Sequence, residues 1–64
     1  MYKVSLKAAR VNANLTQSQV AAALNITQRT IVSWENGKTS PPINQFEKLC
    51  KIYNVPIDNI FLNK

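Results

Sequence analysis

The sequence predicts an all-α fold, a compact bundle of five short helices that forms a single domain over residues 1–64. Hydrophobic residues recur at the three- and four-residue spacing of helices, and the only alternation, at Tyr2 and Val4, is too short for a strand. Capping residues and helix breakers divide the chain at short intervals. A chain of this length buries only about 60% of its unfolded surface, which suits one small core.

The first helix is expected to begin after Ser5, whose side chain can cap it, and to run to about Ala13. Its inward face has the spacing i, i+3, i+4, i+7 and consists of Leu6, Ala9, Arg10 and Ala13. An arginine on an inward face needs a carboxylate partner, because an unpaired buried charge is costly.

A second helix follows in the segment LTQSQVAAAL. Thr16 and Gln19 have the spacing of a capping box, and the three alanines favour helix. The residues expected to face inward are Val20, Ala21 and Leu24. Asn25 ends this helix, because asparagine tolerates the left-handed conformation that turns a chain sharply.

Thr27 caps a third helix only three residues after Leu24. Gly37, the only glycine, fits the left-handed position that follows Asn36 at the end of this helix. The side chains expected to turn inward are Ile31, Trp34 and Glu35.

The segment TSPP then breaks the chain, and a fourth helix is expected with Pro42 near its first turn, where a missing N–H is harmless. Its inward stripe consists of Phe46, Leu49, Cys50 and Tyr53, and Cys50 is read as a small buried hydrophobe rather than a reactive thiol. Val55 and Pro56 end this helix, and the segment IDNIFL predicts a fifth, short helical turn.

The composition argues against several classes of function. The chain has no histidine, one cysteine and three carboxylates, so we expect no enzyme, no metal and no cofactor. It contains neither an apolar run of about 18 residues nor the hydrophobic region of a signal peptide, so we expect a cytoplasmic protein that does not enter a membrane. The net charge of +5 favours a polyanionic partner, although charge alone is weak support.

Residues 17–36 have the organisation of a helix-turn-helix motif, two short helices joined by a turn of about three residues. Ala21, at the point where the helices cross, and Asn25, in the turn, suit this geometry. The second helix of the motif has an outward face that carries no carboxylate and consists of Gln28, Arg29, Val32, Ser33 and Asn36. A polar helix face is, taken alone, usually just solvated.

From Leu6 to about Leu62 the chain resembles the phage repressor and Cro-like, or XRE-type, helix-turn-helix family. The resemblance rests on LTQSQVAAAL, on the pattern T-x-x-x-I-x-x-W-E-N-G-K, and on Y-x-V-P-I-D-N-I-F. It implies a lambda-repressor-like DNA-binding domain and a sequence-specific transcriptional regulator, a phage or bacterial repressor or Cro-like protein. The sequence departs from the family at Asn25, where glycine is usual, and at Pro56, where a serine or threonine cap is usual.

The resemblance implies that the second helix of the motif lies in the major groove of double-stranded DNA, with its N-terminal residues against base edges. The expected base contacts are Thr27, Gln28, Arg29, Val32 and Ser33. Val32 either touches a thymine methyl group or is merely tolerated on this face. The expected phosphate contacts are Gln17, Thr30, Asn36, Lys38 and Thr39.

The resemblance also supplies a partner for Arg10. Glu35 lies on the inward side of its own helix, and the related repressors pair an arginine with a glutamate at these two positions. We therefore expect a partly buried Arg10–Glu35 ion pair that fixes the first helix to the reading helix.

One reading helix covers few base pairs, so we expect a homodimer that reads an inverted repeat, and the sequence leaves open whether it forms only on DNA. The end of the chain offers more apolar surface than one helical turn can bury, so the expected dimer contact is Ile57, Phe61 and Leu62. Alternatively, Ile60 and Phe61 simply close the core. No small-molecule substrate is evident, and the competing function is an antitoxin-like or adaptor module whose main partner is another protein.

Overall fold

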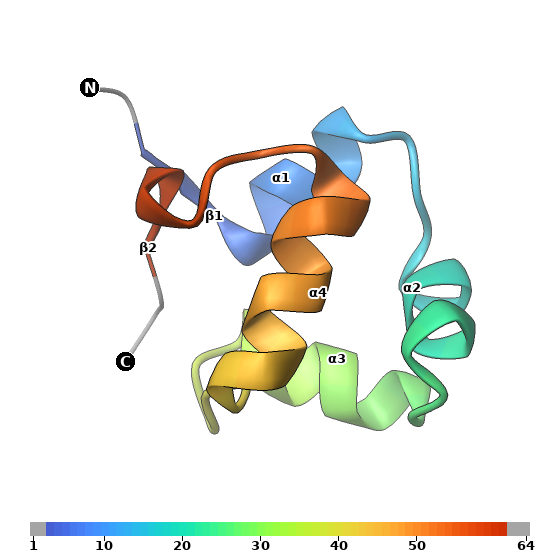
Figure 1. The fold of residues 1–64 in the computed structure, drawn as a ribbon. Coiled ribbons are helices and arrows are strands. Elements are labelled where there is room, and N and C mark those ends of the chain that lie inside the picture. Colours follow the sequence, from blue (N-terminus) through green and yellow to red (C-terminus); the bar gives the residue numbers. More distant parts are fainter. Residues whose placement is uncertain (1–2, 62–64) are drawn as a thin grey trace.

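The computed structural model describes residues 3–61, with the side chain of Phe61 excluded. This part of the chain forms four α-helices, one short 3-10 helix and two strands (Figure 1). In chain order they are β1 (Val4–Ser5), α1 (Leu6–Asn12), α2 (Gln17–Leu24), α3 (Gln28–Glu35), α4 (Ile43–Tyr53), η1 (Ile57–Asn59) and β2 (Ile60–Phe61).

The first three helices start where their capping residues predict. Ser5 accepts a hydrogen bond of 3.1 Å from the backbone N–H three residues later. Thr16 and Gln19 form the predicted capping box, with bonds of 3.1 and 2.8 Å. Thr27 caps α3 in the same way as Ser5 caps α1. These caps satisfy N–H groups that have no partner inside the helix.

Each of the four α-helices is followed by a residue in the left-handed region: Asn14, Asn25, Gly37 and Asn54, with φ between 57° and 78°. The next N–H along the chain then bonds back into the last turn, as from Ile26 to the Ala21 carbonyl at 2.9 Å. This pattern is the Schellman motif, which satisfies the last carbonyl groups of a helix. The sequence predicted it at Asn25 and Gly37 and missed it at the other two positions.

Two predictions need correction: the fifth helical turn is shorter than expected, and a small sheet is present. The segment after Pro56 makes only the 3-10 turn η1 and then becomes extended at Ile60, with φ −111° and ψ 130°. β2 pairs in parallel with β1, in a register that places Val4 beside Ile60 and Ser5 beside Phe61. Strands of two residues are too short for alternation to be recognised in a sequence.

The core lies where α1, α2, α3 and α4 meet, and its buried apolar residues are Leu6, Ala9, Val20, Ala21, Leu24, Ile31, Trp34, Leu49, Cys50, Tyr53 and Ile60. The predicted burial of Trp34 and Cys50 is confirmed. Figure 1 shows α4 crossing in front of α1, with α2 and α3 along the right and lower edges and the strand pair on the left. The fold therefore presents the helix-turn-helix at a different edge from the strands.

Candidate nucleic-acid interface

Helix α3 turns one face into the core and the other outward. Ile31, Trp34 and Glu35 are buried, as the sequence predicted. Gln28 and Arg29 are exposed, Val32 and Ser33 are half-buried, and Asn36 is exposed just after the helix. The structure thus leaves the predicted base-contacting residues of α3 on its outer surface, and their contact with DNA stays a prediction.

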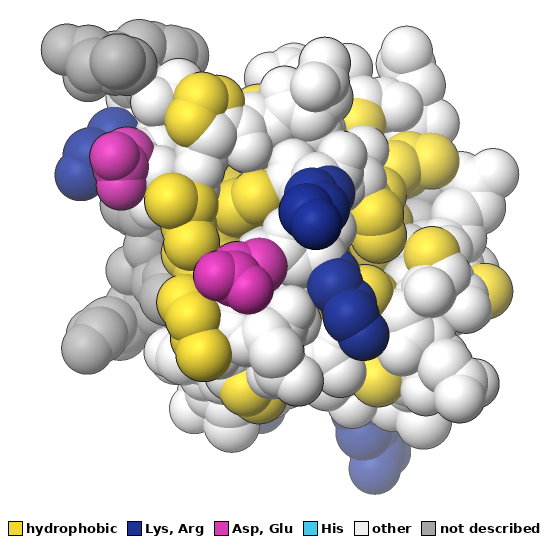
Figure 2. Space-filling model, in the orientation of Figure 1, with side chains coloured by type: hydrophobic (Ala, Val, Ile, Leu, Met, Phe, Trp, Pro, Cys, Tyr) yellow, Lys and Arg dark blue, Asp and Glu magenta, His cyan; other side chains and the backbone are white. Residues whose placement is uncertain are grey.

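The outer face of α3 carries no carboxylate. The chain has three acidic residues, and the only one on α3, Glu35, is buried. Glu47 lies on α4 and Asp58 on η1. On the side of the molecule in Figure 2, acidic side chains lie over α4 and beside the strand pair. A polyanion that approached the exposed side of α3 would therefore meet no acidic side chain of this helix.

An ion pair fixes the orientation of α3 from the inside. Arg10 Nε lies 2.7 Å from Glu35 Oε2, and Arg10 Nη2 lies 3.4 Å from Oε1. Arg10 Nη1 also donates to the Leu15 carbonyl at 2.9 Å. The hydrogen bond to Glu35 raises the pKa of Arg10 above its usual value, against the opposing effect of burial. The structure thus contains the expected link between α1 and the outer helix of the motif.

Hydrogen bonds continue from this ion pair to the protein surface. Gln17 Nε2 donates to Glu35 Oε1 at 3.1 Å, and Gln28 Nε2 donates to Gln17 Oε1 at 3.3 Å. Ser18 Oγ then donates to Gln28 Oε1 at 2.9 Å. We call these five residues, Arg10, Glu35, Gln17, Gln28 and Ser18, the glutamine relay. It connects the buried charges to the first residue of α3.

The sequence identified two glutamines and the ion pair but not the relay that joins them. Gln17 was predicted only as a phosphate contact, and Ser18 was not singled out. The short turn between α2 and α3 did indicate that the start of α3 lies near α2. Which side chains of the two first turns would meet depends on the crossing angle, which the sequence does not give.

Hydroxyl groups surround the same surface. Thr27 Oγ1 and Thr30 Oγ1 lie 2.9 Å apart, and Thr39 Oγ1 donates to Ser33 Oγ at 3.2 Å. The second bond holds the loop after Gly37 against α3. Lys38, on that loop, is exposed. The predicted base contact Ser33 and the predicted phosphate contact Thr39 therefore lie together.

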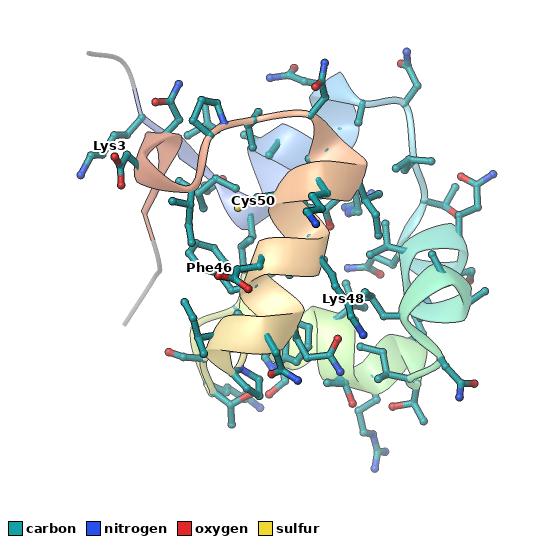
Figure 3. All side chains as sticks on the ribbon, in the orientation of Figure 1. Lys3, Phe46, Lys48 and Cys50 are labelled. Atoms are coloured by element: carbon teal, nitrogen blue, oxygen red, sulfur yellow. The ribbon has the colours of Figure 1, made fainter. Side chains whose placement is uncertain are left out.

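The predicted dimer residues fall on another part of the molecule. Ile57 is 38% exposed, whereas Ile60 is buried in the core. The side chain of Phe61 and all of Leu62 lie outside the described residues. Ile57 borders a pocket whose other lining residues are Glu47, Cys50, Lys51, Asn54, Val55 and Pro56. Figure 3 shows Phe46 and Cys50 on the side of α4 that faces the strands, with Lys48 on the opposite side.

Within residues 3–61, no three side chains of the metal-binding types His, Cys, Asp and Glu lie close enough together to hold a metal ion. In the same part of the chain, every helix is too short or too polar to cross a membrane.

Burial, with a smaller effect of Glu47, raises the pKa of the Cys50 thiol. This cysteine is therefore held in its less reactive, protonated form.

In a comparison with known protein families, residues 6–60 match the Helix-turn-helix family. The cryptic phage CTXphi transcriptional repressor RstR of Vibrio cholerae is 35% identical over 57 residues, which are 89% of this chain and 51% of RstR. An uncharacterized HTH-type transcriptional regulator of Methanocaldococcus jannaschii is 37% identical over 60 residues, 94% of this chain and 91% of that protein.

The HTH-type transcriptional activator BcrR of Enterococcus faecalis is 32% identical over 59 residues, 92% of this chain but 29% of BcrR. The chain thus spans about half the length of RstR and less than a third of BcrR. No solved structure gave a significant match.

Proposed function

The chain belongs to the Helix-turn-helix family, and from this premise we propose that it is a sequence-specific transcriptional regulator that binds double-stranded DNA. The observation that supports this most is the outer face of α3, which is free of carboxylates and fixed to the core by the Arg10–Glu35 ion pair. The matched relatives are transcriptional regulators by name. A regulator of this kind needs no catalytic group, and we place it in the cytoplasm with the DNA it controls.

Helix α3 has dimensions that suit the major groove. An α-helix with its side chains is about 10–12 Å across, which fits the roughly 12 Å width of the major groove in B-DNA. In the proposed complex, Arg29 forms a bidentate pair with a guanine and Gln28 with an adenine, since their donors and acceptors match those base edges. The flanking residues Thr27, Val32 and Ser33 make shorter contacts with neighbouring bases.

Phosphates on either side of the groove are bound by the surrounding residues. Gln17 begins α2, whose first turn contains no acidic residue, so the positive end of this helix is open to a phosphate. Lys38 and Thr39 project from the loop after Gly37. We assign the same role to Thr30 and Asn36. These contacts set the register of the protein on DNA and carry no sequence information themselves.

We propose that two copies bind one inverted repeat. One copy has a single candidate reading helix, α3, whereas the equivalent half-sites of an inverted repeat lie about 34 Å apart in successive major grooves. Two half-sites therefore need two copies. The contact between copies would be made by Ile57 together with the predicted residues Phe61 and Leu62.

The charged residues around Ile57 also support a two-fold contact at this surface. Glu47 and Lys51, one helical turn apart on α4, both line the pocket that Ile57 borders. In a two-fold contact, if one residue contacts a second residue of the partner subunit, the reverse contact is also made. Such a contact would set Glu47 against Lys51 of the partner subunit twice over, around an apolar centre.

The competing function, an antitoxin-like or adaptor module, would need a large apolar surface away from the dimer contact. Outside the Ile57 region, the large apolar side chains exposed among the described residues are Val11 and Ile43, at 53% and 65%. They lie near the end of α1 and at the start of α4, which Figure 1 places at opposite edges of the molecule. Two separate side chains do not make a docking surface, and DNA remains the better supported partner.

The test begins with selection of duplexes from a random-sequence library by the wild-type chain. Arg29→Ala should then lose about 1–3 kcal/mol on the selected site and relax one base position. Lys38→Ala should weaken binding to all sequences alike and reduce the salt slope by about one unit. Lys3, beside the strand pair in Figure 3, is the control, and Lys3→Ala should leave both base preference and affinity nearly unchanged.

Equal losses on the selected duplex and on random DNA would show that Arg29 contacts phosphate rather than a base. Failure to enrich any sequence would overturn the proposal of a sequence-specific regulator.

A further inference from the structure

We infer that Ser18 is a positioning residue for base readout, whose hydroxyl holds the side-chain amide of Gln28 in the orientation that recognises adenine. The inference rests on the proposed function, in which Gln28 meets a base edge. It assigns Ser18 a role through Gln28 rather than a contact of its own with DNA.

The glutamine relay has a fixed direction because it begins at a charge. An ionised carboxylate only accepts hydrogen bonds, so Gln17 must turn its NH2 group toward Glu35. The Gln17 oxygen then faces Gln28 and accepts from its NH2 group. The Gln28 oxygen in turn faces the Ser18 hydroxyl, which donates to it. Each amide is thereby oriented by the buried ion pair.

Ser18 provides the shorter of the two bonds that hold Gln28. The Ser18 Oγ–Gln28 Oε1 distance is 2.9 Å, whereas the Gln28 Nε2–Gln17 Oε1 distance is 3.3 Å, near the limit for a hydrogen bond. Gln28 and Ser18 are both exposed, so the amide would rotate easily if it were held by the longer bond alone. Without the Ser18 hydroxyl, the Gln28 amide would be held only by its longer bond to Gln17. We therefore expect this amide to rotate more freely in a variant that lacks the hydroxyl.

The two bonds leave Gln28 with the groups that adenine requires. A primary amide has two N–H donors and two acceptor lone pairs, and the relay uses one of each. One donor and one acceptor remain. Adenine offers an acceptor at N7 and a donor at N6, whereas guanine offers acceptors at both N7 and O6. An amide that cannot rotate would meet guanine with one acceptor facing another.

A different role for Ser18 would be a direct phosphate contact, because it lies in the first turn of α2. The two roles differ in what they do to sequence preference. A phosphate contact weakens binding to every sequence alike, whereas loss of the amide orientation lowers affinity for the adenine-containing site and spares its guanine variant.

The experiment uses the full chain and two duplexes: the one selected by the wild-type chain, and its variant with guanine at the position that Gln28→Ala relaxes. We expect Ser18→Ala to lower the adenine-to-guanine affinity ratio roughly five-fold, the size of one ordinary hydrogen bond. Ser18→Thr, which keeps the hydroxyl, should restore the ratio. In a Gln28→Ala background, Ser18→Ala should change neither affinity nor preference.

Three outcomes would overturn the inference. An unchanged ratio in Ser18→Ala, or an equal loss on both duplexes that persists in the Gln28→Ala background, would do so while leaving Gln28 as a reader. If Gln28→Ala relaxes no position of the selected site, the base-reading role of Gln28 fails, and the inference about Ser18 fails with it.

Discussion

At the scale of single residues, the Arg10–Glu35 pair has the largest energetic consequence. Only 11% of the Arg10 side chain and 4% of the Glu35 side chain are exposed. Both charges have thus lost most of their hydration, and each depends on the other for compensation. Glu35 also accepts a hydrogen bond from the Gln17 amide, so its removal would affect the candidate DNA-binding surface as well as the core.

Glu35→Ala should lower the free energy of unfolding by about 3–5 kcal/mol, because it leaves Arg10 buried without its partner. A loss of this size is enough to unfold a marginally stable domain. Chemical denaturation measures it directly. Glu47→Ala, which removes an exposed glutamate from α4, is the control and should change stability by no more than about 0.5 kcal/mol. A melting temperature left unchanged by Glu35→Ala would contradict the prediction.

Tyr53 makes stability depend on alkaline pH. Burial, together with the Glu35 carboxylate and against the effect of Arg10, raises the pKa of its phenol to about 12. In the unfolded chain the phenol ionises near pH 10, so between these values the unfolded state releases a proton that the folded state keeps. The contribution of Tyr53 to the free energy of unfolding is fully present below about pH 10. It falls by roughly 3 kcal/mol as the pH rises toward 12.

Urea denaturation at a series of pH values from 9 to 12 checks this. The matched variant Tyr53→Phe cannot ionise and should show a smaller decline over that range, the remainder coming from other groups. Parallel curves for the two proteins would contradict the proposed origin of the effect.

Which residues of the candidate site face outward was largely predictable from their spacing along the helices, whereas the roles predicted for them come from the resemblance. Arg10 was identified by its place on an inward face, and Glu35 by its inward position and by the resemblance. The role of Ser18 was not predictable, because serine in the first turn of a helix is ordinary. Only the packing of α2 against α3 brings its hydroxyl to Gln28.

At the scale of elements, the chain ends its helices in one repeated way. Asn14, Asn25 and Asn54 adopt the left-handed conformation that only Gly37 can adopt without strain. Asparagine tolerates it better than other residues with a β-carbon. At these three positions, glycine would adopt the same backbone conformation with less strain.

Asn25→Ala should therefore lower stability by about 1 kcal/mol, and Asn25→Gly should leave it unchanged or raise it slightly. Asn44 lies inside α4 and offers a control, because Asn44→Ala places a better helix former in a helical position. Thermal unfolding of the three variants measures the differences. Equal effects of alanine at positions 25 and 44 would show that the left-handed conformation is not the cause.

Element boundaries could be predicted where a side chain sets them. The caps Ser5, Thr16 and Thr27 start helices that the sequence located. The last segment was misjudged because Pro56 provides no side-chain cap and the turn after it stops at three residues. The β1–β2 pairing joins the two ends of the described chain, and no local pattern reports such a contact.

At the scale of the whole molecule, the proposed assembly on DNA would use the surface around Ile57, which carries both an acidic and a basic residue, Glu47 and Lys51. Glu47→Lys should weaken the proposed two-fold contact, because it sets lysine against lysine twice. Adding Lys51→Glu restores opposite charges and the original net charge, so the double variant should recover the wild-type assembly. Sedimentation of the protein with an inverted-repeat duplex measures how many copies bind.

One chain on the inverted repeat at saturating wild-type protein would exclude the dimer. If the dimer forms but the double variant pairs no better than Glu47→Lys, the contact lies on a different surface.

The parallel pairing of β1 with β2 also has a mechanical consequence. Because the two strands run in the same direction, tension on the chain before β1 and after β2 pulls them past one another along their length. Their hydrogen bonds are then loaded together rather than opened one at a time. A pull from any attached domain or tether therefore reaches this strand pair first, at an edge away from α3 (Figure 1).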